Sequence, residues 1–231
     1  MTESLSPAVG WGVLHLFFEA DQFVDGDALV AAVTRCQADQ HQVITFAVLG
    51  HKGDIGVMAL GPDLWRLRKL QTDLQRTGLT LIDSYVSMTE VSEYAKGIPD
   101  DMLKARLYPL LPPEGMRAYC FYPMSKRRGV GDADVNWFTL PFEDRKALMH
   151  EHGVSGRKFA GRIIQLITGS TGIDDYEWGV TLFAQKPDDL KEVVYTMRFD
   201  KASTDFAEFG PFVMGVVGSL GEVLEVVGLP A

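Results

Sequence analysis

The stretch "HQVITFAVLGHKGDIGVMALG", residues 41–61, decides the fold of this chain. It holds two short apolar runs rich in β-branched residues, and such runs predict β-strands. Only a few polar and glycine residues separate them, so a turn rather than a helix is expected between the two strands. The elements on either side then identify the larger unit to which this pair belongs.

A strand and a helix precede this pair, and a helix and a strand follow it. Residues 11–18, "WGVLHLFF", predict a strand, and residues 79–90 predict another. The segment 25–40 predicts a helix with Asp25 or Asp27 as its N-cap, and segment 62–78 predicts a helix between a proline and a glycine. Each helix has one apolar face, formed by Leu29, Ala32, Val33 and Cys36 in the first and by Leu64, Leu67, Leu70 and Leu74 in the second. The order βαββαβ is that of the ferredoxin-like unit.

The second half of the chain repeats this order of elements without repeating the sequence. Strands are predicted at residues 116–123, 162–169, 176–185 and 210–218, and helices at 141–153 and 186–199. We therefore predict an α+β protein with two ferredoxin-like halves, each an antiparallel sheet with helices outside. The proline-rich, mostly irregular segment 95–115 places the boundary, giving an N-terminal half of 1–105 and a C-terminal half of 106–231.

Composition and motifs exclude several functional classes. A net charge of −9 argues against nucleic acid and anionic membranes as main partners. No run of 18 apolar residues predicts a membrane span, and the first residues do not resemble a secretory signal. Two cysteines without a CxxC motif suit a reducing, cytoplasmic setting. The absence of HExxH, GxSxG and GxGxxG argues against zinc proteases, α/β-hydrolases and Rossmann enzymes.

Two histidines lie close together in the helix predicted at 141–153. His150 and His152 point about 200° apart on a helix, so they cannot bind one ion together. His152 shares the face of Leu148 and is expected to point inward, while His150 faces solvent, and Gly153 is expected to end the helix. From spacing alone, an inward histidine at a helix end is either a hydrogen-bonded structural residue or a ligand.

Two other polar side chains stand out in apolar surroundings. Gln165 lies between Ile163 and Ile167 on one face of a predicted strand, so its amide needs either a ligand or a protein partner. Tyr122 ends an apolar strand just before the basic run 126–128. A tyrosine near an oxidising cofactor supplies a radical, whereas a strand-end tyrosine beside a solvated basic loop has no chemical role.

Several longer blocks carry a family resemblance. The sequences "CFYPMSKRR", "NWF", "LMHEHGVSGRKFAGRIIQLITGSTGIDDYEWGVTLF", "VVYTMRFD" and "AEFGPF" resemble the coproheme decarboxylases, the haem-synthesising branch of the chlorite dismutase superfamily. The resemblance is densest from about Arg106 to Phe212. It implies a fold of the dimeric α+β barrel type, a homopentamer, and one coproheme bound in the C-terminal half.

The resemblance also assigns roles to individual residues. His152, in "HG-x-x-GR", matches the axial ligand of the haem iron, and Tyr122, in "YPM", matches the radical-forming tyrosine. Gln165 matches a glutamine on the distal side of the haem. Propionate or porphyrin contacts are implied for Arg106, Met124, Lys126 and Ser203, and secondary candidates are Tyr85, Trp137, Arg157 and Arg198.

Three positions help to indicate which branch of the superfamily this chain resembles. Chlorite-degrading relatives have a catalytic arginine in the strand of Gln165, and a neutral amide cannot supply the same electrostatic stabilisation. Some decarboxylases have a distal histidine base where this chain has Ala105. The stretch Gly129–Asp134 lengthens the loop after the basic run.

The implied reaction uses hydrogen peroxide and iron-coproporphyrin III, which is both substrate and redox cofactor. A radical on Tyr122 would start the loss of CO2 from propionates 2 and 4, leaving the two vinyl groups of haem b. The coproporphyrin ferrochelatase is the implied transient partner. The alternatives are a chlorite dismutase-like haem peroxidase and a haem or coproheme carrier that performs no turnover.

Overall fold

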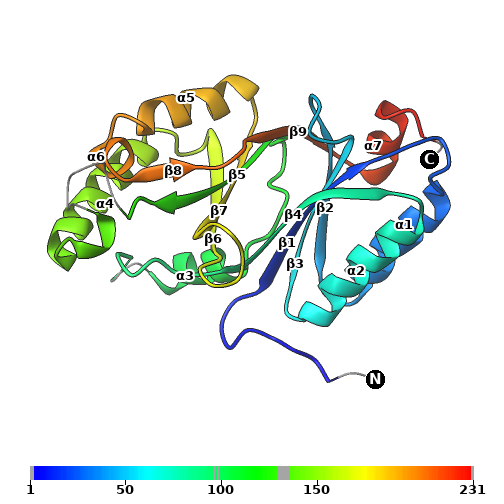
Figure 1. Ribbon diagram of the computed structural model, residues 1–231, viewed down its shortest axis with the longest axis horizontal. Coiled ribbons are helices and arrows are strands. Elements are labelled where there is room, and N and C mark those ends of the chain that lie inside the picture. Colours follow the sequence, from blue (N-terminus) through cyan, green and yellow to red (C-terminus); the bar gives the residue numbers. More distant parts are fainter. Residues whose placement is uncertain (1–2, 96, 98, 129–135, 230–231) are drawn as a thin grey trace.

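The computed structural model describes residues 3–95, 97, 99–128 and 136–229. Two halves lie side by side, with helices on the outside of each (Figure 1). The N-terminal half confirms the predicted order, with elements β1 (Gly12–Glu19), α1 (Gly26–Ala38), β2 (Gln42–Val48), β3 (Ile55–Gly61), α2 (Leu64–Arg76) and β4 (Thr80–Thr89).

The C-terminal half contains every predicted element and several more. The predicted elements are β5 (Ala118–Lys126), α4 (Phe142–Arg157), β6 (Ile163–Gly169), β7 (Trp178–Ala184), α5 (Pro187–Met197) and β9 (Val213–Gly218). The additional ones are α3 (Asp100–Leu107), the 3₁₀ turn η1 (Trp137–Thr139), α6 (Lys201–Thr204), β8 (Ala207–Phe209) and α7 (Leu220–Val226). Among the described residues, no helix is both long and apolar enough to span a bilayer.

The strands form one antiparallel sheet rather than the two separate sheets that the sequence predicted. Their order is β7-β6-β4-β1-β3-β2-β9-β5-β8, and an additional pairing of β7 with β5 closes the sheet into a barrel. The pairs β4–β6 and β2–β9 join the two halves. The fold is therefore α+β with ferredoxin-like halves, as predicted, and the halves share their backbone hydrogen bonding.

Closing the sheet creates three separate cores. The barrel interior is filled by aliphatic and aromatic side chains, and the aromatic ones include Phe17, Phe46, Tyr119, Phe121 and Phe183. A second core lies between the N-terminal strands and α1, α2 and α7, and a third lies between the C-terminal strands and α5, joined by Phe159 just after α4. Because strand residues alternate between faces, β5 and β7 contribute to the interior with one face and contact α5 with the other.

The prediction that Gly153 ends a helix is wrong. Helix α4 continues four residues further, to Arg157. The residues beyond Gly153 have tertiary partners, since Ser155 is buried, the Gly156 backbone lies beside Met197 of α5, and Phe159 packs into the third core. Such packing overrides the modest cost of a glycine within a helix.

The predicted boundary between residues 105 and 106 falls inside a helix. Segment 95–115 was expected to be mostly irregular, but it contains α3, which spans the proposed cut. The chain also returns to its first half at the end, because Val223 and Leu224 of α7 belong to the core of α1 and α2. The halves are therefore distinct in the order of their elements but are not independent segments in space.

Candidate functional site

The outer face of the C-terminal strands forms a grid of aligned side chains. Tyr122 of β5 pairs with Val180 of β7, which pairs with Ile167 of β6, so these three residues form one row. Gln165 lies in the neighbouring row, beside Leu182. From the spacing of strands and residues, the backbones of Tyr122 and Gln165 are about 12 Å apart on this face.

Part of this face is open. Ile163, Gln165 and Ile167 share it as predicted, but only Ile163 is buried, and Ile167 is 45% exposed. Gln165 is exposed as well, and its amide has no hydrogen-bond partner among the described residues, so the alternative of a protein partner is wrong and the ligand alternative stays a prediction. A ligand lying on β6 would meet one amide and apolar neighbours.

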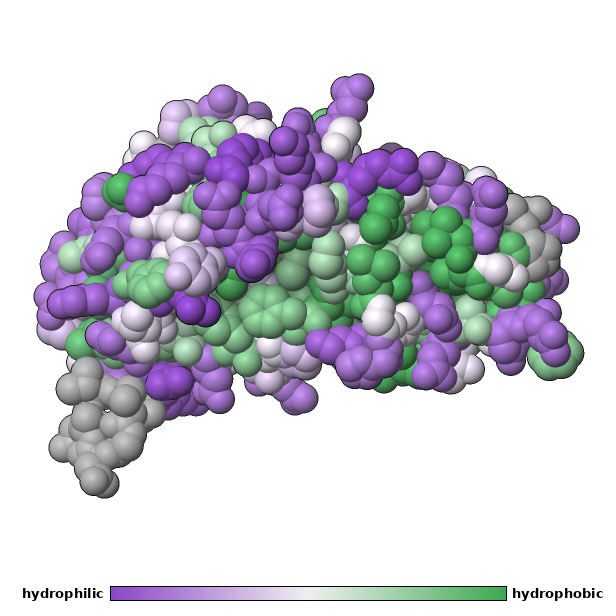
Figure 2. Space-filling model, turned by 90° about the horizontal axis from the view of Figure 1, so that it is seen from above, coloured by the Kyte–Doolittle hydropathy of each residue, from purple (hydrophilic) through white to green (hydrophobic). Residues whose placement is uncertain are grey.

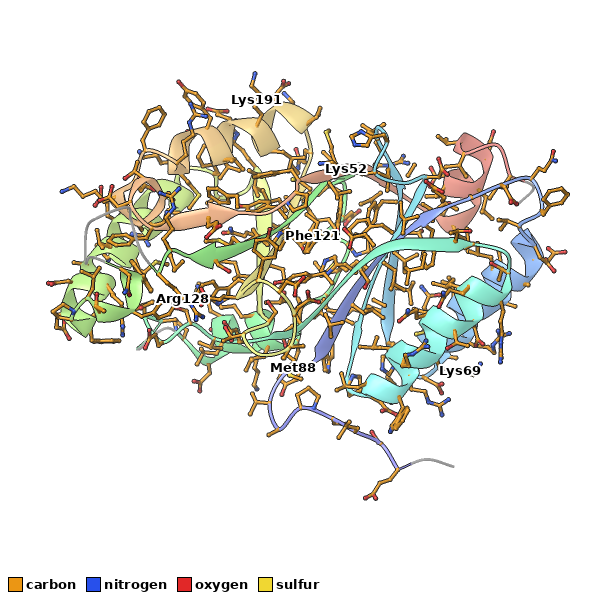
Figure 3. The ribbon with its side chains drawn as sticks, viewed as in Figure 1. Lys52, Lys69, Met88, Phe121, Arg128 and Lys191 are labelled. Carbon is orange, nitrogen blue, oxygen red and sulfur yellow. The ribbon has the colours of Figure 1, made fainter. Side chains whose placement is uncertain are left out.

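Tyr122 is covered by two phenylalanine rings at the other end of its row. Its ring stacks on Phe212 with 4.4 Å between centroids and meets the edge of Phe209 at 5.7 Å. Burial raises the pKa of the Tyr122 phenol above its ordinary value. Lys52, labelled in Figure 3, reaches from the N-terminal half and donates a 2.5 Å hydrogen bond to the Phe212 carbonyl oxygen. Tyr122 is thus a protonated phenol, and the segment of Phe212 that covers it is anchored by the hydrogen bond from Lys52.

His152 points inward from α4, while His150 is exposed, as the helical spacing predicted. The side chain of His152 is 25% exposed, and its Nδ1 lies 3.2 Å from Oδ2 of Asp200. The other oxygen of this buried carboxylate accepts a 2.8 Å hydrogen bond from Ser155 Oγ. Asp200 is the N-cap of the short helix α6 and connects it to α4.

The charge state of His152 follows from these surroundings. Burial lowers the pKa of the imidazole, the nearby Lys126 charge lowers it further, and Asp200 acts in the opposite direction. A carboxylate only accepts hydrogen bonds, so the neutral imidazole carries its proton on Nδ1. Its Nε2 lone pair is then available, which is the arrangement of histidines that bind metals.

Sequence reasoning missed Asp200 as a functional residue. It stands at the end of the block "VVYTMRFD", which drew attention through its resemblance and not through the aspartate. The two partners are 48 residues apart, so no local spacing relates them. The only local signal is an acidic residue directly before the four-residue helix α6.

Lys126 does not extend into solvent as a surface basic residue would. It is 7% exposed, and its Nζ donates a 2.5 Å hydrogen bond to the Ala202 carbonyl oxygen. Its ammonium also lies 4.5 Å from the centroid of the buried Trp137 ring. Burial lowers the pKa of Lys126 to about 8. Arg127 and Arg128, in contrast, are exposed, so only part of the basic run is ordinary surface.

The remaining candidate residues differ in how far they are exposed to solvent. Met124 is half-buried on the outer face of β5, and Ser203 is buried in α6. Three arginines are exposed, with Arg106 on α3, Arg157 at the end of α4, and Arg198 stacked 4.6 Å from the Tyr195 ring. The loop at Gly129–Asp134 lies outside the described residues.

Tyr85 does not join this group, because it lies inside the barrel. Its ring is 5.3 Å from that of Phe121, which Figure 3 labels at the junction of the halves, and its hydroxyl group hydrogen-bonds with Ser170. Phe121 and Tyr122 are consecutive strand residues, so they point to opposite faces of the sheet. Tyr85 is therefore separated from Tyr122 by the sheet itself.

Two cavities lie away from this face. One of about 560 Å³ is bounded by α1, α7 and residues 112–117, and one of about 230 Å³ lies at the mouth of the barrel near Tyr85. Neither is lined by Tyr122, His152 or Gln165. Seen from above, apolar side chains form a band across the middle of the molecule, with polar side chains around it (Figure 2). Of the candidate residues, Tyr122, Lys126 and Ser203 are buried, whereas Gln165 and the three arginines are exposed.

Comparison with known proteins gives a consistent picture. The chlorite dismutase family profile matches residues 19–218. A coproheme decarboxylase of Staphylococcus carnosus is 38% identical, with 94% of this chain and 95% of that protein aligned. A Natronomonas pharaonis protein, described as a candidate haem-binding protein, is 41% identical over 89% of this chain, which spans only 39% of that longer protein. A solved structure of a haem-binding protein from Thermus thermophilus superposes with a TM-score of 0.84 at 34% identity, covering 99% and 98% of the two chains.

Proposed function

This chain belongs to the chlorite dismutase family, and we propose that it is a coproheme decarboxylase that converts iron-coproporphyrin III into haem b with hydrogen peroxide. The observation that carries the proposal is the pairing of His152 with Asp200, which leaves Nε2 as a free ligand atom. Tyr122 and Gln165, on one face of the sheet, supply the second and third groups that the reaction needs.

The residues present fit an iron porphyrin. Nδ1 of His152 is hydrogen-bonded to a buried carboxylate, and such an outer partner orients the ring and raises its basicity toward iron. The exposed Ile167 and Gln165 offer an apolar surface with one amide. When bound, the iron porphyrin supplies the redox chemistry with peroxide, and the protein supplies position and charge.

Tyr122 is the proposed radical site. Because its phenol is protonated, it loses a proton together with an electron when oxidised. The radical then takes a hydrogen atom from the β-carbon of a propionate, and departure of CO2 with one further electron leaves a vinyl group. Each propionate releases two electrons, and one molecule of peroxide accepts them. Phe209 and Phe212 keep bulk water away from the phenol during this step.

Basic side chains are proposed to hold the propionates of this polyanionic substrate. Arg106, Arg157 and Arg198 are exposed and available for such contacts, while Lys126 would have to leave the Ala202 carbonyl oxygen. Hydrogen bonds between charged donors and carboxylates are the strong kind. We further propose a cytoplasmic homopentamer that meets the coproporphyrin ferrochelatase transiently.

The test is to add hydrogen peroxide to the purified protein with ferric coproheme and to follow the porphyrin by mass spectrometry. Two successive losses of CO2 are expected. Tyr122→Phe is expected to bind coproheme and to release no CO2, whereas the control Tyr85→Phe, inside the barrel, retains turnover. Full turnover by Tyr122→Phe would exclude the radical role, and intact coproheme in the wild type would exclude the reaction.

A further inference from the structure

Two phenylalanine rings lie between Tyr122 and solvent on the outer face of β5. The ring of Phe212 stacks on the phenol ring, and the ring of Phe209 meets it edge-on. Tyr122 is buried, whereas Phe209 and Phe212 are themselves exposed. Residues 209–212, called the lid below, therefore form the layer that keeps the phenol from water.

One extra residue brings both rings of the lid to this face. At one end of the lid, Phe209 pairs with Met124 of β5. Just beyond the other end, Val213 pairs with Phe121 of β5. Three steps along β5 therefore correspond to four steps along the chain that carries the lid, which has one residue more than a regular strand. Such a β-bulge re-aims side chains, and here it turns both rings toward the phenol, although residues three apart on a regular strand point to opposite faces.

Between these two pairings, the lid forms two hydrogen bonds to other described segments. The Gly210 N–H donates to the Pro123 carbonyl oxygen at 2.8 Å, and Lys52 Nζ donates to the Phe212 carbonyl oxygen at 2.5 Å. Pro211 lies between these two bonds and has no N–H to donate. Among the described residues, Lys52 is therefore the only side chain that holds the lid at Phe212 by a hydrogen bond.

Lys52 belongs to the N-terminal half, in the turn between β2 and β3. The turn is fixed beside β9, because β2 pairs with β9 and the Leu49 N–H donates a 2.9 Å hydrogen bond to the Met214 carbonyl oxygen. Burial raises the pKa of the Cys120 thiol to about 12, and the Lys52 charge acts in the opposite direction. Cys120 and Tyr122 share one face of β5, so the ammonium lies near the face that carries the phenol.

We propose that Lys52 is a positioning residue for Tyr122, which holds the lid closed over the phenol until the lid opens to admit the substrate. A propionate must reach the phenol to give up a hydrogen atom, and a lid that never opened would prevent this contact. This role rests on the proposed function. Closing behind the substrate then keeps bulk water from the phenol, as active-site lids do. The bond from Lys52 thus joins the turn of one half to the reactive side chain of the other.

The test measures access to the phenol in the haem-free protein. N-acetylimidazole acetylates tyrosine hydroxyl groups that reach solvent, and peptide mass spectrometry gives a separate rate for each tyrosine. Lys52→Met removes the ammonium donor and keeps a side chain of similar length. We expect acetylation of Tyr122 to become faster by about 10-fold or more, the change in an equilibrium that follows from losing a hydrogen bond of a charged group. Tyr108, which is exposed, and Tyr85, inside the barrel, should react at unchanged rates.

Three further variants complete the design. Lys52→Arg keeps a charged donor and is expected to restore the wild-type rate at Tyr122. Lys191→Met removes an exposed lysine of α5, which Figure 3 also labels, and should leave every rate unchanged. Phe212→Ala removes the stacked ring and leaves Lys52 in place, so it opens the phenol to acetylation by a second route.

The outcomes separate this proposal from the proposed function. An unchanged rate at Tyr122 in Lys52→Met or in Phe212→Ala would overturn the role of Lys52 and its lid. Equal acceleration of Tyr122 and Tyr85 would overturn it as well, because a general loosening of the barrel would then account for the result. Because the assay contains no porphyrin, a protein that releases no CO2 from coproheme rejects the decarboxylase, while the acetylation rates still decide whether Lys52 holds the lid closed.

Discussion

Replacing Asp200 with alanine tests whether the histidine is oriented by its buried partner. The change removes two hydrogen bonds, from His152 Nδ1 and from Ser155 Oγ. Only the first lies on the proposed iron ligand, so the two losses have different consequences. The imidazole of Asp200→Ala can turn, and neither tautomer is favoured any longer.

The magnitude follows from these two contacts. Loss of an outer hydrogen-bond partner of a metal-bound histidine costs about 10–100-fold in metal affinity, which corresponds to about 1.4–2.8 kcal/mol. Hydrogen bonds to charged groups contribute about 1.5–3 kcal/mol each to stability. Asp200→Ala is therefore expected to weaken ferric haem binding by about 10–100-fold and also to lower the free energy of unfolding.

The matched control is Ser155→Ala, which removes the second hydrogen bond and keeps the carboxylate beside His152. It is expected to lower the free energy of unfolding by about 1.5–3 kcal/mol and to leave haem affinity within about threefold, since the pairing with His152 is intact. Affinity is measured by titration with ferric haem, followed by absorbance, and stability by urea unfolding of the haem-free protein.

Two results would refute the reasoning. If Asp200→Ala binds haem with the affinity and spectrum of the wild type, Asp200 does not orient the ligand. If Ser155→Ala weakens haem binding as much as Asp200→Ala, the effect comes from the local folding of α4 and not from the imidazole.

Three further changes test other parts of the structure. Because burial lowers the pKa of Lys126 to about 8, the unfolded chain binds more protons than the folded one between about pH 8 and 10.5. In urea titrations from pH 8 to 9.5, the free energy of unfolding of the wild type should therefore rise relative to that of Lys126→Met. Parallel plots of the two free energies against pH would contradict the lowered pKa of Lys126. Gln165→Arg changes an exposed position and should therefore change the free energy of unfolding by less than about 0.5 kcal/mol. In a separate measurement with an oxygen electrode, the wild type should release no oxygen from chlorite. Phe159→Ala should destabilise the fold by about 3–5 kcal/mol in urea unfolding, since the ring is 4% exposed in the third core, and a loss below about 1 kcal/mol would contradict that packing.

Local patterns in the sequence determined which elements form and which way their side chains face. The apolar spacing of α1 and α2 predicted their buried sides, and Asp25 is the N-cap of α1, accepting a 2.9 Å hydrogen bond from the Ala28 N–H. Strand alternation correctly placed Gln165 with Ile163 and Ile167, and helical spacing distinguished His152 from His150. These properties depend on residues within a few positions of each other, so a single sequence displays them.

Only the tertiary structure decided how these elements meet. The closure of the barrel, the continuation of α4 past Gly153, the placement of Tyr85 inside the barrel and the pairing of His152 with Asp200 all depend on contacts between distant segments. So does the hydrogen bond from Lys52 to the Phe212 carbonyl oxygen. The physical reason is that periodicity states which face of an element is apolar but not which other element covers it. Strand register and helix packing together decide which elements are in contact, and here strands of the two halves also form backbone hydrogen bonds with each other.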